Sequence, residues 1–204
     1  MSILRTPRKT PGPAILSDRD GLKQQIRAIL TSRVRHTLDA SGLISAAVLV
    51  PMLFKEGQWH VLVTLRTERV EHHKGQISFP GGACDPEDVG LEATALRETL
   101  EEIGVSPGEV EVLGVLDDMT TITDFAVTPF VGVIPHPYSY QLNEDEVEAV
   151  VEVPLSFLRD PSNLRVERRQ IQGRVYDLLF WNYGIYTIWG ATARILKSLL
   201  DLIP

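Results

Sequence analysis

Residues 79–105, FPGGACDPEDVGLEATALRETLEEIGV, place a double glycine ahead of a segment that carries seven carboxylates in 27 residues. Glu101 and Glu102 follow Glu98 by three and four residues, so on a helix these acids would share one face. Like charges at such spacing repel by roughly a few tenths of a kcal/mol per exposed pair. Clustered glutamate oxygens are the hard ligands that Mg²⁺ or Mn²⁺ prefers. The segment therefore predicts a divalent-metal site rather than a plain solvated acidic face.

The residues around these acids have the pattern of an amphipathic helix over 91–103. Four apolar residues recur every three or four positions and predict a stripe that packs on the core, with the carboxylates facing away from it. Gly104 follows the last apolar residue and is expected to cap the helix at its C-terminus. Arg97 precedes Glu101 by four residues and could orient it. The predicted buried stripe consists of Ala93, Leu96, Leu100 and Ile103.

Residues 82–105 resemble the Nudix box, whose usual form is Gx5Ex7REUxEExGU, where U is a bulky apolar residue. The half that runs from Arg97 to Val105, RETLEEIGV, carries the arginine, the three glutamates and the glycine at the family spacing. Thr99 departs from the pattern because it is polar where the family has an apolar residue. Asp88 stands in place of the first glutamate, and eight residues rather than seven separate it from Arg97. One residue has thus entered the junction of loop and helix, where Asp85 could cap a helix with Pro86 at its first position.

A second resemblance lies upstream of the box. The coenzyme A pyrophosphatase subfamily carries the signature LLTxR[SA]x3Rx3Gx3FPGG, and residues 62–82 read LVTLRTERVEHHKGQISFPGG. Val63 and Thr67 are mild departures, and Glu71 reverses the charge of the second signature arginine. Arg69 and Lys74 are close enough in sequence to substitute for that arginine. The matching positions are Leu62, Thr64, Arg66, Gly75 and Phe79 to Gly82.

The two resemblances imply a metal-dependent hydrolase that splits the diphosphate of coenzyme A or a derivative into 3',5'-ADP and 4'-phosphopantetheine, or its acyl form. They assign Glu98 and Glu102 as the main ligands of Mg²⁺ or Mn²⁺, with Glu101 and the Gly82 carbonyl as further ligands. Glu146 is the candidate general base, and its neighbours Glu144, Asp145 and Glu148 compete with it. The residues expected to contact substrate are Arg66, Arg69, Lys74, Gly75, Phe79 and Gly81.

Two other functions stay open at this point. A Nudix hydrolase of another dinucleotide, such as NADH or ADP-ribose, is favoured by the charge reversal at Glu71. A catalytically silent nucleotide-binding module on the same fold would be expected to lose one or more of Glu98, Glu101 and Glu102, and all three are present.

Bulk properties place the chain among ordinary globular proteins. It has 204 residues, a net charge of -7 and one cysteine, Cys84. The acidic balance argues against a general nucleic-acid partner, and no apolar run is long enough to cross a membrane. The lone cysteine and the lack of a signal segment predict a cytoplasmic location, while the acid-free first 17 residues leave a mitochondrial presequence as the alternative. A small molecule is the expected partner, and a homodimer is left open.

The hydrophobic patterns predict an α/β protein, and the resemblance implies a Nudix-type α/β/α sandwich with a mixed β-sheet. Residues 1–16 contain three prolines and are expected to form a flexible basic arm, ahead of a single domain over 17–204. Helices are expected over about 17–36, 91–103 and 192–203. Strands are expected in ISAAVLVPMLF, WHVLVTLR, VEVLGVLDDM and VTPFVGVI, in the segment after the acidic loop NEDEVE, and in a hairpin around Gln172-Gly173.

Overall fold

A mixed β-sheet forms the centre of the molecule in the computed structural model, which describes residues 18–69, 75–171 and 174–203. Within these ranges no helix is long and apolar enough to cross a membrane. The predicted arm over 1–16 and the turn at Gln172-Gly173 lie outside the described residues. The central sheet contains β1 (Ile44–Lys55), β2 (Gln58–Arg66), β3 (Ile77–Ser78), β4 (Gly81–Ala83), β5 (Glu111–Val115), β6 (Met119–Thr120), β7 (Phe125–Val133) and β8 (Val147–Pro154).

The long strands β1 and β2 form the middle of this sheet. They pair in an antiparallel hairpin around a tight turn, in which Glu56 and Gly57 both have positive φ. β1 pairs in parallel with β7, and β2 pairs antiparallel with both β3 and β8. β1 also pairs antiparallel with β4, so the double glycine is itself part of the sheet. The sheet is therefore mixed, as expected.

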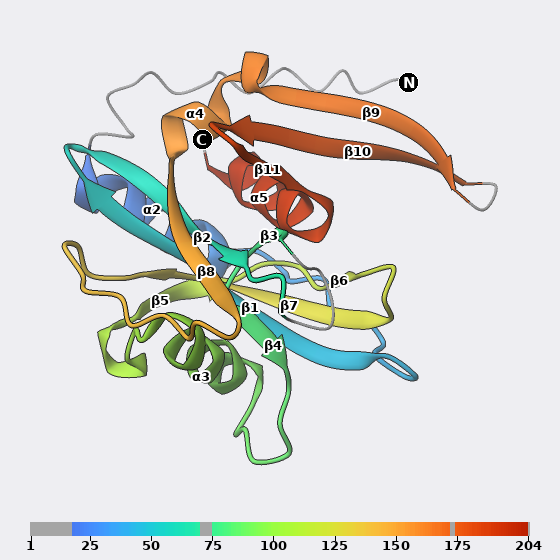
Figure 1. Cartoon of the computed structure of the whole chain (residues 1–204), viewed down its shortest axis with the longest axis horizontal. Coiled ribbons are helices and arrows are strands. Elements are labelled where there is room, and N and C mark those ends of the chain that lie inside the picture. Colours follow the sequence, from blue (N-terminus) through green and yellow to red (C-terminus); the bar gives the residue numbers. More distant parts are fainter. Residues whose placement is uncertain (1–17, 70–74, 172–173, 204) are drawn as a thin grey trace.

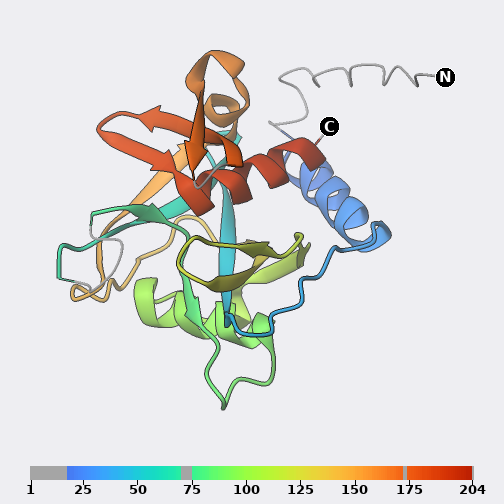
Figure 2. The same ribbon diagram turned by 90° about the vertical axis from the view of Figure 1, so that its right-hand side faces the viewer.

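Helices cover both faces of the sheet. The helix α3 (Leu91–Ile103) packs on one face, while α2 (Arg19–Ser32), α4 (Leu155–Arg159) and α5 (Gly190–Leu202) lie on the other. Figure 2 shows α3 below the sheet and α2 and α5 above it. Two short 3₁₀ turns, η1 (Pro107–Glu109) and η2 (Pro161–Asn163), join neighbouring elements. This arrangement confirms the predicted α/β/α sandwich.

A second, smaller sheet lies beside α5 and extends away from the body of the molecule (Figure 1). It is built from β9 (Leu164–Ile171), β10 (Arg174–Tyr183) and β11 (Tyr186–Trp189), which pair antiparallel in the order β11-β10-β9. One of its faces turns inward, where Trp181 and Ile188 are buried in the core.

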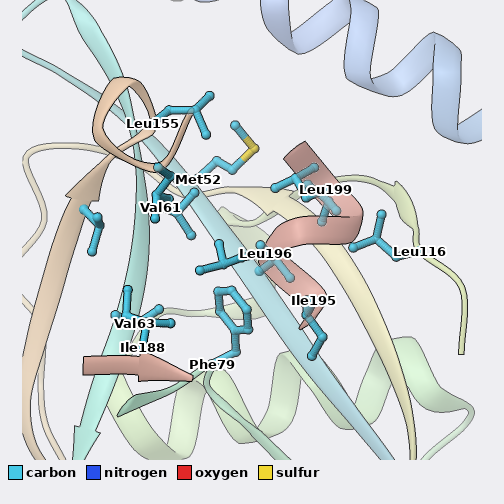
Figure 3. Close-up of a cluster of buried hydrophobic side chains, with 14 of the residues drawn as sticks. Met52, Val61, Val63, Phe79, Leu116, Leu155, Ile188, Ile195, Leu196 and Leu199 are labelled. Atoms are coloured by element: carbon cyan, nitrogen blue, oxygen red, sulfur yellow. The ribbon is translucent and has the colours of Figure 1, made fainter. Parts of the chain in front are cut away.

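The larger of two hydrophobic clusters fills the space between the sheet and α5 (Figure 3). Residues at alternate positions of β2, Val61 and Val63, face this cluster, whereas Leu62 faces the smaller cluster under α3. This alternation follows from the two-residue period of a strand, which sends successive side chains to opposite sides of a sheet. The two faces of β2 thus serve two different layers.

The N-terminal helix is shorter than its predicted span of 17–36. It begins after Asp18, whose side chain accepts a hydrogen bond from the Gly21 amide at 3.0 Å, and it ends at Ser32. Leu22, Ile26 and Leu30 form its buried stripe, as the spacing predicts.

Candidate active site

The glutamate-bearing helix α3 has the bounds that the sequence predicts. It begins at Leu91 and ends at Ile103, followed by Gly104 in the left-handed conformation with φ of 74°. The Gly104 amide donates to the Leu100 carbonyl at 2.9 Å and so closes the last turn. The helix starts after Gly90, however, and the predicted cap at Asp85 with Pro86 in the first turn is wrong. Residues 85–88 instead form a turn, in which the Asp88 amide donates to the Asp85 carbonyl at 3.0 Å.

The buried face of α3 differs from the predicted stripe. Leu100 is 42% exposed and Ala93 and Leu96 are only partly buried, so the prediction was right for Ile103 alone. Thr99 is buried, and its hydroxyl donates to the Ala95 carbonyl at 2.6 Å, which satisfies the polar group where the family pattern has an apolar one. The helix therefore turns partly polar residues toward the sheet. Its buried residues are Thr94, Ala95, Thr99, Glu102 and Ile103.

Glu102 is the most buried carboxylate of the segment, and the expectation that it faces away from the core is wrong. It is only 1% exposed, and its Oε2 atom has no hydrogen-bond partner. Desolvation raises the pKa of Glu102 to about 8, helped by the negative charges of Glu98 and Glu146 and opposed by Arg66 and the Gly81 amide. Among the described residues, Arg66 pairs with Glu102, with Nη1 at 3.7 Å from Oε1. A buried carboxylate with an unpartnered oxygen is costly unless a cation completes its coordination.

Glu98 lies against the double glycine. A Cβ atom built on Gly82 would lie 2.6 Å from the carboxylate of Glu98, so a side chain at residue 82 would collide with that carboxylate. Burial raises the pKa of Glu98, the hydrogen bond and charge of Arg97 lower it, and Glu101 and Glu146 raise it further. The close approach of strand β4 to α3 therefore depends on glycine at this position.

Arg97 is hydrogen-bonded to three acids of the site. Its Nη1 donates to Glu98 at 2.8 Å and to Glu101 at 3.1 Å, which confirms the predicted i to i+4 contact. Its Nε and Nη2 both donate to Asp88 at 3.0 Å, a two-pronged pairing that holds the pKa of Asp88 well below its usual range. Asp88 also accepts from the Asp85 amide and the Thr94 hydroxyl. Asp88 thus joins the loop to the helix despite the extra residue before Arg97.

Two further residues reach the site, Arg66 from the end of β2 and Glu146 from the loop before β8. A register shift in the pairing of β2 with β8 falls between Leu65 and Arg66, at the point where Arg66 reaches Glu102. The Thr67 amide donates to the Glu146 carbonyl at 2.9 Å, which ties the acidic loop to the end of β2. The charge of Glu146 raises the pKa of both Glu98 and Glu102. The competing acids of this loop, Glu144, Asp145 and Glu148, are exposed.

Only some of the predicted substrate residues lie at the candidate site; others lie in the core or at the surface. Phe79 is 3% exposed and packs in the large core cluster (Figure 3), so its side chain contributes to the core. Arg69 lies at the surface and forms an exposed ion pair with Asp145 at 3.4 Å. Gly81 approaches β1 so closely that a Cβ atom would lie 2.4 Å from the Ala47 carbonyl oxygen. Gly75 has φ of 62°, and Lys74 lies outside the described residues.

Asn143 is a site residue that the sequence analysis did not identify. Its side-chain amide donates to Glu146 Oε1 at 3.2 Å, and its carbonyl accepts from the Glu146 amide at 2.9 Å. The Asn143 amide in turn donates to the Glu102 carbonyl oxygen at 3.0 Å. Asparagine often starts a turn by accepting a hydrogen bond from the backbone two residues on, as the Asn143 side chain does from the Asp145 amide at 3.2 Å, and this tendency could have indicated the turn.

The donor set fits a divalent metal ion, but the candidate ligands do not all lie close together. Within the described ranges, no group of three or more His, Cys, Asp and Glu residues lies close enough together to hold an ion. Arg97 now bonds to Glu98 and Glu101, so metal binding requires their oxygens to turn from Arg97 or share it. The unpartnered Oε2 of Glu102 and the Glu98 carboxylate that lies against Gly82 are where a cation would add contacts that the chain lacks. Carboxylate and carbonyl oxygens are the ligands that Mg²⁺ and Mn²⁺ prefer.

Comparisons with known proteins agree with this geometry. Residues 43–171 match the family model described as NUDIX domain. A relative from Enterobacter sp. (strain 638), called Uncharacterized Nudix hydrolase NudL, is 42% identical over 170 residues, or 82% of this chain and 86% of the relative. A protein of the same description from Citrobacter koseri is 44% identical over 157 residues, or 76% of this chain and 80% of the relative. The crystal structure of a NUDIX hydrolase from Alicyclobacillus acidocaldarius has a TM-score of 0.52 at 22% identity, covers 78% of this chain and 91% of its own, and supports the fold.

Proposed function

This chain belongs to the Nudix hydrolase family, and from that premise we propose that it cleaves the diphosphate of coenzyme A or a coenzyme A derivative. The products are 3',5'-ADP and 4'-phosphopantetheine or its acyl form, and the reaction uses Mg²⁺ or Mn²⁺. Nudix hydrolases act on diphosphate bonds and generally use divalent metal ions. The substrate rests on the signature over residues 62–82.

The observation that carries hydrolase activity is the environment of Glu102. Its carboxylate is buried with one oxygen unpartnered, beside Glu98 and Glu146, and one arginine at 3.7 Å does not balance these charges. A protein that used this helix for structure alone would gain stability by placing an uncharged residue there. The presence of an acid at this costly position indicates a function that needs it.

The chain's own groups have distinct roles in the proposed reaction. Glu98 and Glu102 hold the metal, with Glu101 and the Gly82 carbonyl as further ligands. Bound metal supplies charge neutralisation of the phosphate oxygens and a lower pKa for the attacking water. Arg97 orients Glu98 and Glu101 and is itself fixed by Asp88. Metal ligands held by such outer partners keep the geometry that binding requires.

Glu146 is the proposed general base. Asn143 holds its Oε1 from one side, and the bond between the Thr67 amide and the Glu146 carbonyl fixes its backbone at the end of β2. The carboxylate can take a proton from water on the side that faces Glu98 and Glu102. A base must lie within hydrogen-bond reach of the proton it abstracts, and Glu146 is the acid of this loop that approaches the site.

Arg66 is the proposed phosphate ligand. Its guanidinium lies beside Glu102, at 3.7 Å, and is largely buried. Once a cation neutralises Glu102, the guanidinium is available to a phosphate oxygen, which it matches in geometry and charge. The signature position of Arg66 at the end of β2 thus coincides with the entrance to the metal site.

A second candidate is hydrolysis of another dinucleotide, such as NADH or ADP-ribose. It is favoured by Glu71, which replaces a signature arginine, and both Glu71 and Lys74 lie outside the described residues. The silent-module alternative is weaker, because the chain retains all three box glutamates and both Arg97 and Asp88 that support them.

The experiment that separates these functions is hydrolysis of coenzyme A, NADH and ADP-ribose side by side, with Mg²⁺ and with Mn²⁺. Products are resolved by chromatography. We expect coenzyme A to give 3',5'-ADP with the highest kcat/KM. A higher kcat/KM for another dinucleotide would overturn the substrate and keep the family chemistry. No cleavage with either metal would favour the silent module.

A further inference from the structure

A cleft between two edge strands lies next to the proposed active site. The strand β3 ends the path of strands in the central sheet, and β11 ends the small sheet. Between them is a cavity of about 330 Å³, lined by Leu65, Gly75 and Ile77 on one side and by Ile185, Tyr186 and Thr187 on the other. We propose that this cleft binds the pantetheine arm of the substrate, an inference that rests on the proposed coenzyme A substrate.

The β3 wall of the cleft is fixed to helix α5. The Thr192 hydroxyl of α5 donates to the Ile77 carbonyl at 3.0 Å and joins the helix to β3. Ile188 of β11 is buried beside Phe79 and Val63 (Figure 3), so the floor of the cleft is the hydrophobic core. Small-molecule sites commonly have about 300 Å³ or more, so this cleft holds part of a substrate of coenzyme A size.

The position of the cleft connects it to the diphosphate site. Leu65 lines the cleft, and the next residue, Arg66, contacts Glu102 on the other face of β2. Residues 75–77 line the cleft and continue through Phe79 to Gly81 and Gly82 beside the metal ligands. A molecule with its diphosphate at Arg66 can therefore extend over the end of β2 into the cleft.

The chemistry of the lining selects the uncharged half of such a molecule. None of the described residues that line the cleft carries a charge, so it offers no partner for the 3'-phosphate of the nucleotide half. The pantetheine arm is neutral, with two amide groups and a branched apolar segment. The outer edge of β11 presents backbone N–H and C=O groups that can pair with an extended amide chain, while the apolar walls receive the branched carbon segment.

A neighbouring hollow offers a contrast. It lies on the exposed face of the small sheet, has about 270 Å³, is lined by Arg165, Arg169 and Phe180, and shares Thr187 and Trp189 with the cleft. Its two arginines form ion pairs with Glu167. A neutral arm gains less from this charged surface than from the cleft, so the cleft is the better match.

The test compares two neutral substitutions on the small sheet. Thr187→Phe narrows the cleft, and Val175→Phe adds the same ring at an exposed residue of β10 that does not line it. We expect Thr187→Phe to raise KM for coenzyme A by about tenfold, equivalent to about 1.4 kcal/mol of lost binding free energy. Its inhibition constant for 3',5'-ADP, which lacks the arm, should not change. Val175→Phe should match the wild type in both measurements. Tyr186→Ala removes a wall of the cleft at a residue that does not line the hollow, and it should raise KM for coenzyme A as Thr187→Phe does.

Unchanged KM in both cleft variants would overturn the proposal, as would an equal loss of affinity for 3',5'-ADP, which would indicate general disruption. A second readout separates the cleft from the substrate assignment. Trp189 is 41% exposed and lines the cleft, while Trp59 and Trp181 are buried, so the emission of Trp189 should report added pantetheine. If the wild type does not cleave coenzyme A but binds pantetheine saturably and Tyr186→Ala, which alters the cleft and not the hollow, does not, the proposed function fails and the cleft stands. If the wild type shows no saturable response, the cleft assignment fails.

Discussion

Two clusters of arginine and carboxylate lie at different places in the molecule, and they are balanced differently. In the first, Arg33 pairs with Asp117 at 2.6 Å and Arg35 pairs with Asp118. Asp117 also accepts from the His36 amide at 2.9 Å, and Asp118 accepts from the Thr128 hydroxyl. This cluster fastens the chain after α2 to the segment between β5 and β6, with two cations facing two anions.

The second cluster is the proposed active site, where carboxylates outnumber guanidinium groups. Arg97 and Arg66 face five acids, namely Asp88, Glu98, Glu101, Glu102 and Glu146.

The pKa shifts of the carboxylates also differ between the two clusters. Burial is the largest influence on Asp117 and Asp118 and would raise the pKa of each, but their hydrogen bonds and arginine partners outweigh it and the pKa of both is lowered. At Glu98 and Glu102 burial prevails, and the pKa of each is raised. A balanced cluster stabilises the fold by itself, whereas the unbalanced one gains from an added cation.

The largest expected effect comes from Glu102→Gln, which keeps the shape of the side chain and removes the charge. We expect kcat to fall by roughly 10³-fold or more, the loss that about 4 kcal/mol of transition-state stabilisation produces. The protein should stay folded, because the substitution removes a buried charge. Steady-state kinetics with Mg²⁺ and Mn²⁺ and circular dichroism test this. The matched control is Glu92→Gln, which changes an exposed acid on the same helix. Near-normal turnover of Glu102→Gln would contradict the assignment of Glu102 as a metal ligand.

Arg97→Lys should weaken metal binding. Lysine keeps the charge but cannot reproduce the two-pronged pairing with Asp88 together with the bonds to Glu98 and Glu101. Loss of such an outer partner commonly costs about 10- to 100-fold in metal affinity, and calorimetric titration with Mn²⁺ measures it. Arg33→Lys in the balanced cluster should leave the Mn²⁺ affinity unchanged. Equal effects of the two substitutions would show that the clusters do not differ in the way we describe.

The stability of the metal-free protein should depend on pH through Glu102. Its pKa is raised from an ordinary value of 4.5 to about 8, so between these values the folded protein binds a proton that the unfolded chain releases. The free energy of unfolding should therefore fall as pH rises through this window. For Asp117 and Asp118 the lowered pKa gives the opposite sign, with stability lost only as pH falls below about 4.

Thermal unfolding in EDTA at about pH 5.5 and about pH 8 measures this dependence. Added Mn²⁺ should raise the unfolding temperature most at the higher pH, where Glu102 is charged, because a ligand that binds the folded state stabilises it. In Glu102→Gln, the unfolding temperature should fall less between these two pH values. A metal-free protein whose unfolding temperature is constant over this range would contradict the raised pKa.

Asp118→Asn should have the smallest effect and act on stability alone. The change weakens the pairing with Arg35 and the bonds from Thr128 and the Leu38 amide, at a cost of about 2 kcal/mol. Denaturant unfolding measures the change, while kcat and Mn²⁺ affinity should match the wild type. A loss of metal affinity in this variant would connect the two clusters.

Local features of the fold were predictable from the sequence because short-range rules control them. The bounds of α3 follow from its apolar spacing and from the glycine at 104, whose positive φ suits a residue without a side chain. The long strands β1 and β2 follow from their runs of branched apolar residues, and the turn between them from Gly57. The ionic contact of Arg97 with Glu101 follows from helical spacing.

The orientation of α3 was not predictable in this way. Apolar periodicity selects the face with Leu96 and Leu100, but the sheet receives Thr99 and Glu102 instead. Thr94 and Thr99 satisfy their hydroxyl groups locally, which lowers the cost of burying a polar face. A helix that carries ligands for a site must turn them inward, so its buried face contains polar residues and its apolar periodicity does not identify that face.

The sequence by itself therefore determined the acids, the glycines, the helix that carries them and the class of sheet, because each depends on neighbours a few residues away. Only the tertiary structure decided that Glu102 is buried against Arg66, that Glu146 is the loop acid near the site, that Asp88 supports Arg97, and that Phe79 belongs to the core. The contacts of Glu102 and Glu146 join positions that are tens of residues apart, and the burial of Phe79 depends on helix α5, far along the chain. These contacts are set by the pairing of β2 with β3 and β8 and by the packing of helices on both faces of the sheet. No local sequence pattern encodes contacts between such distant positions.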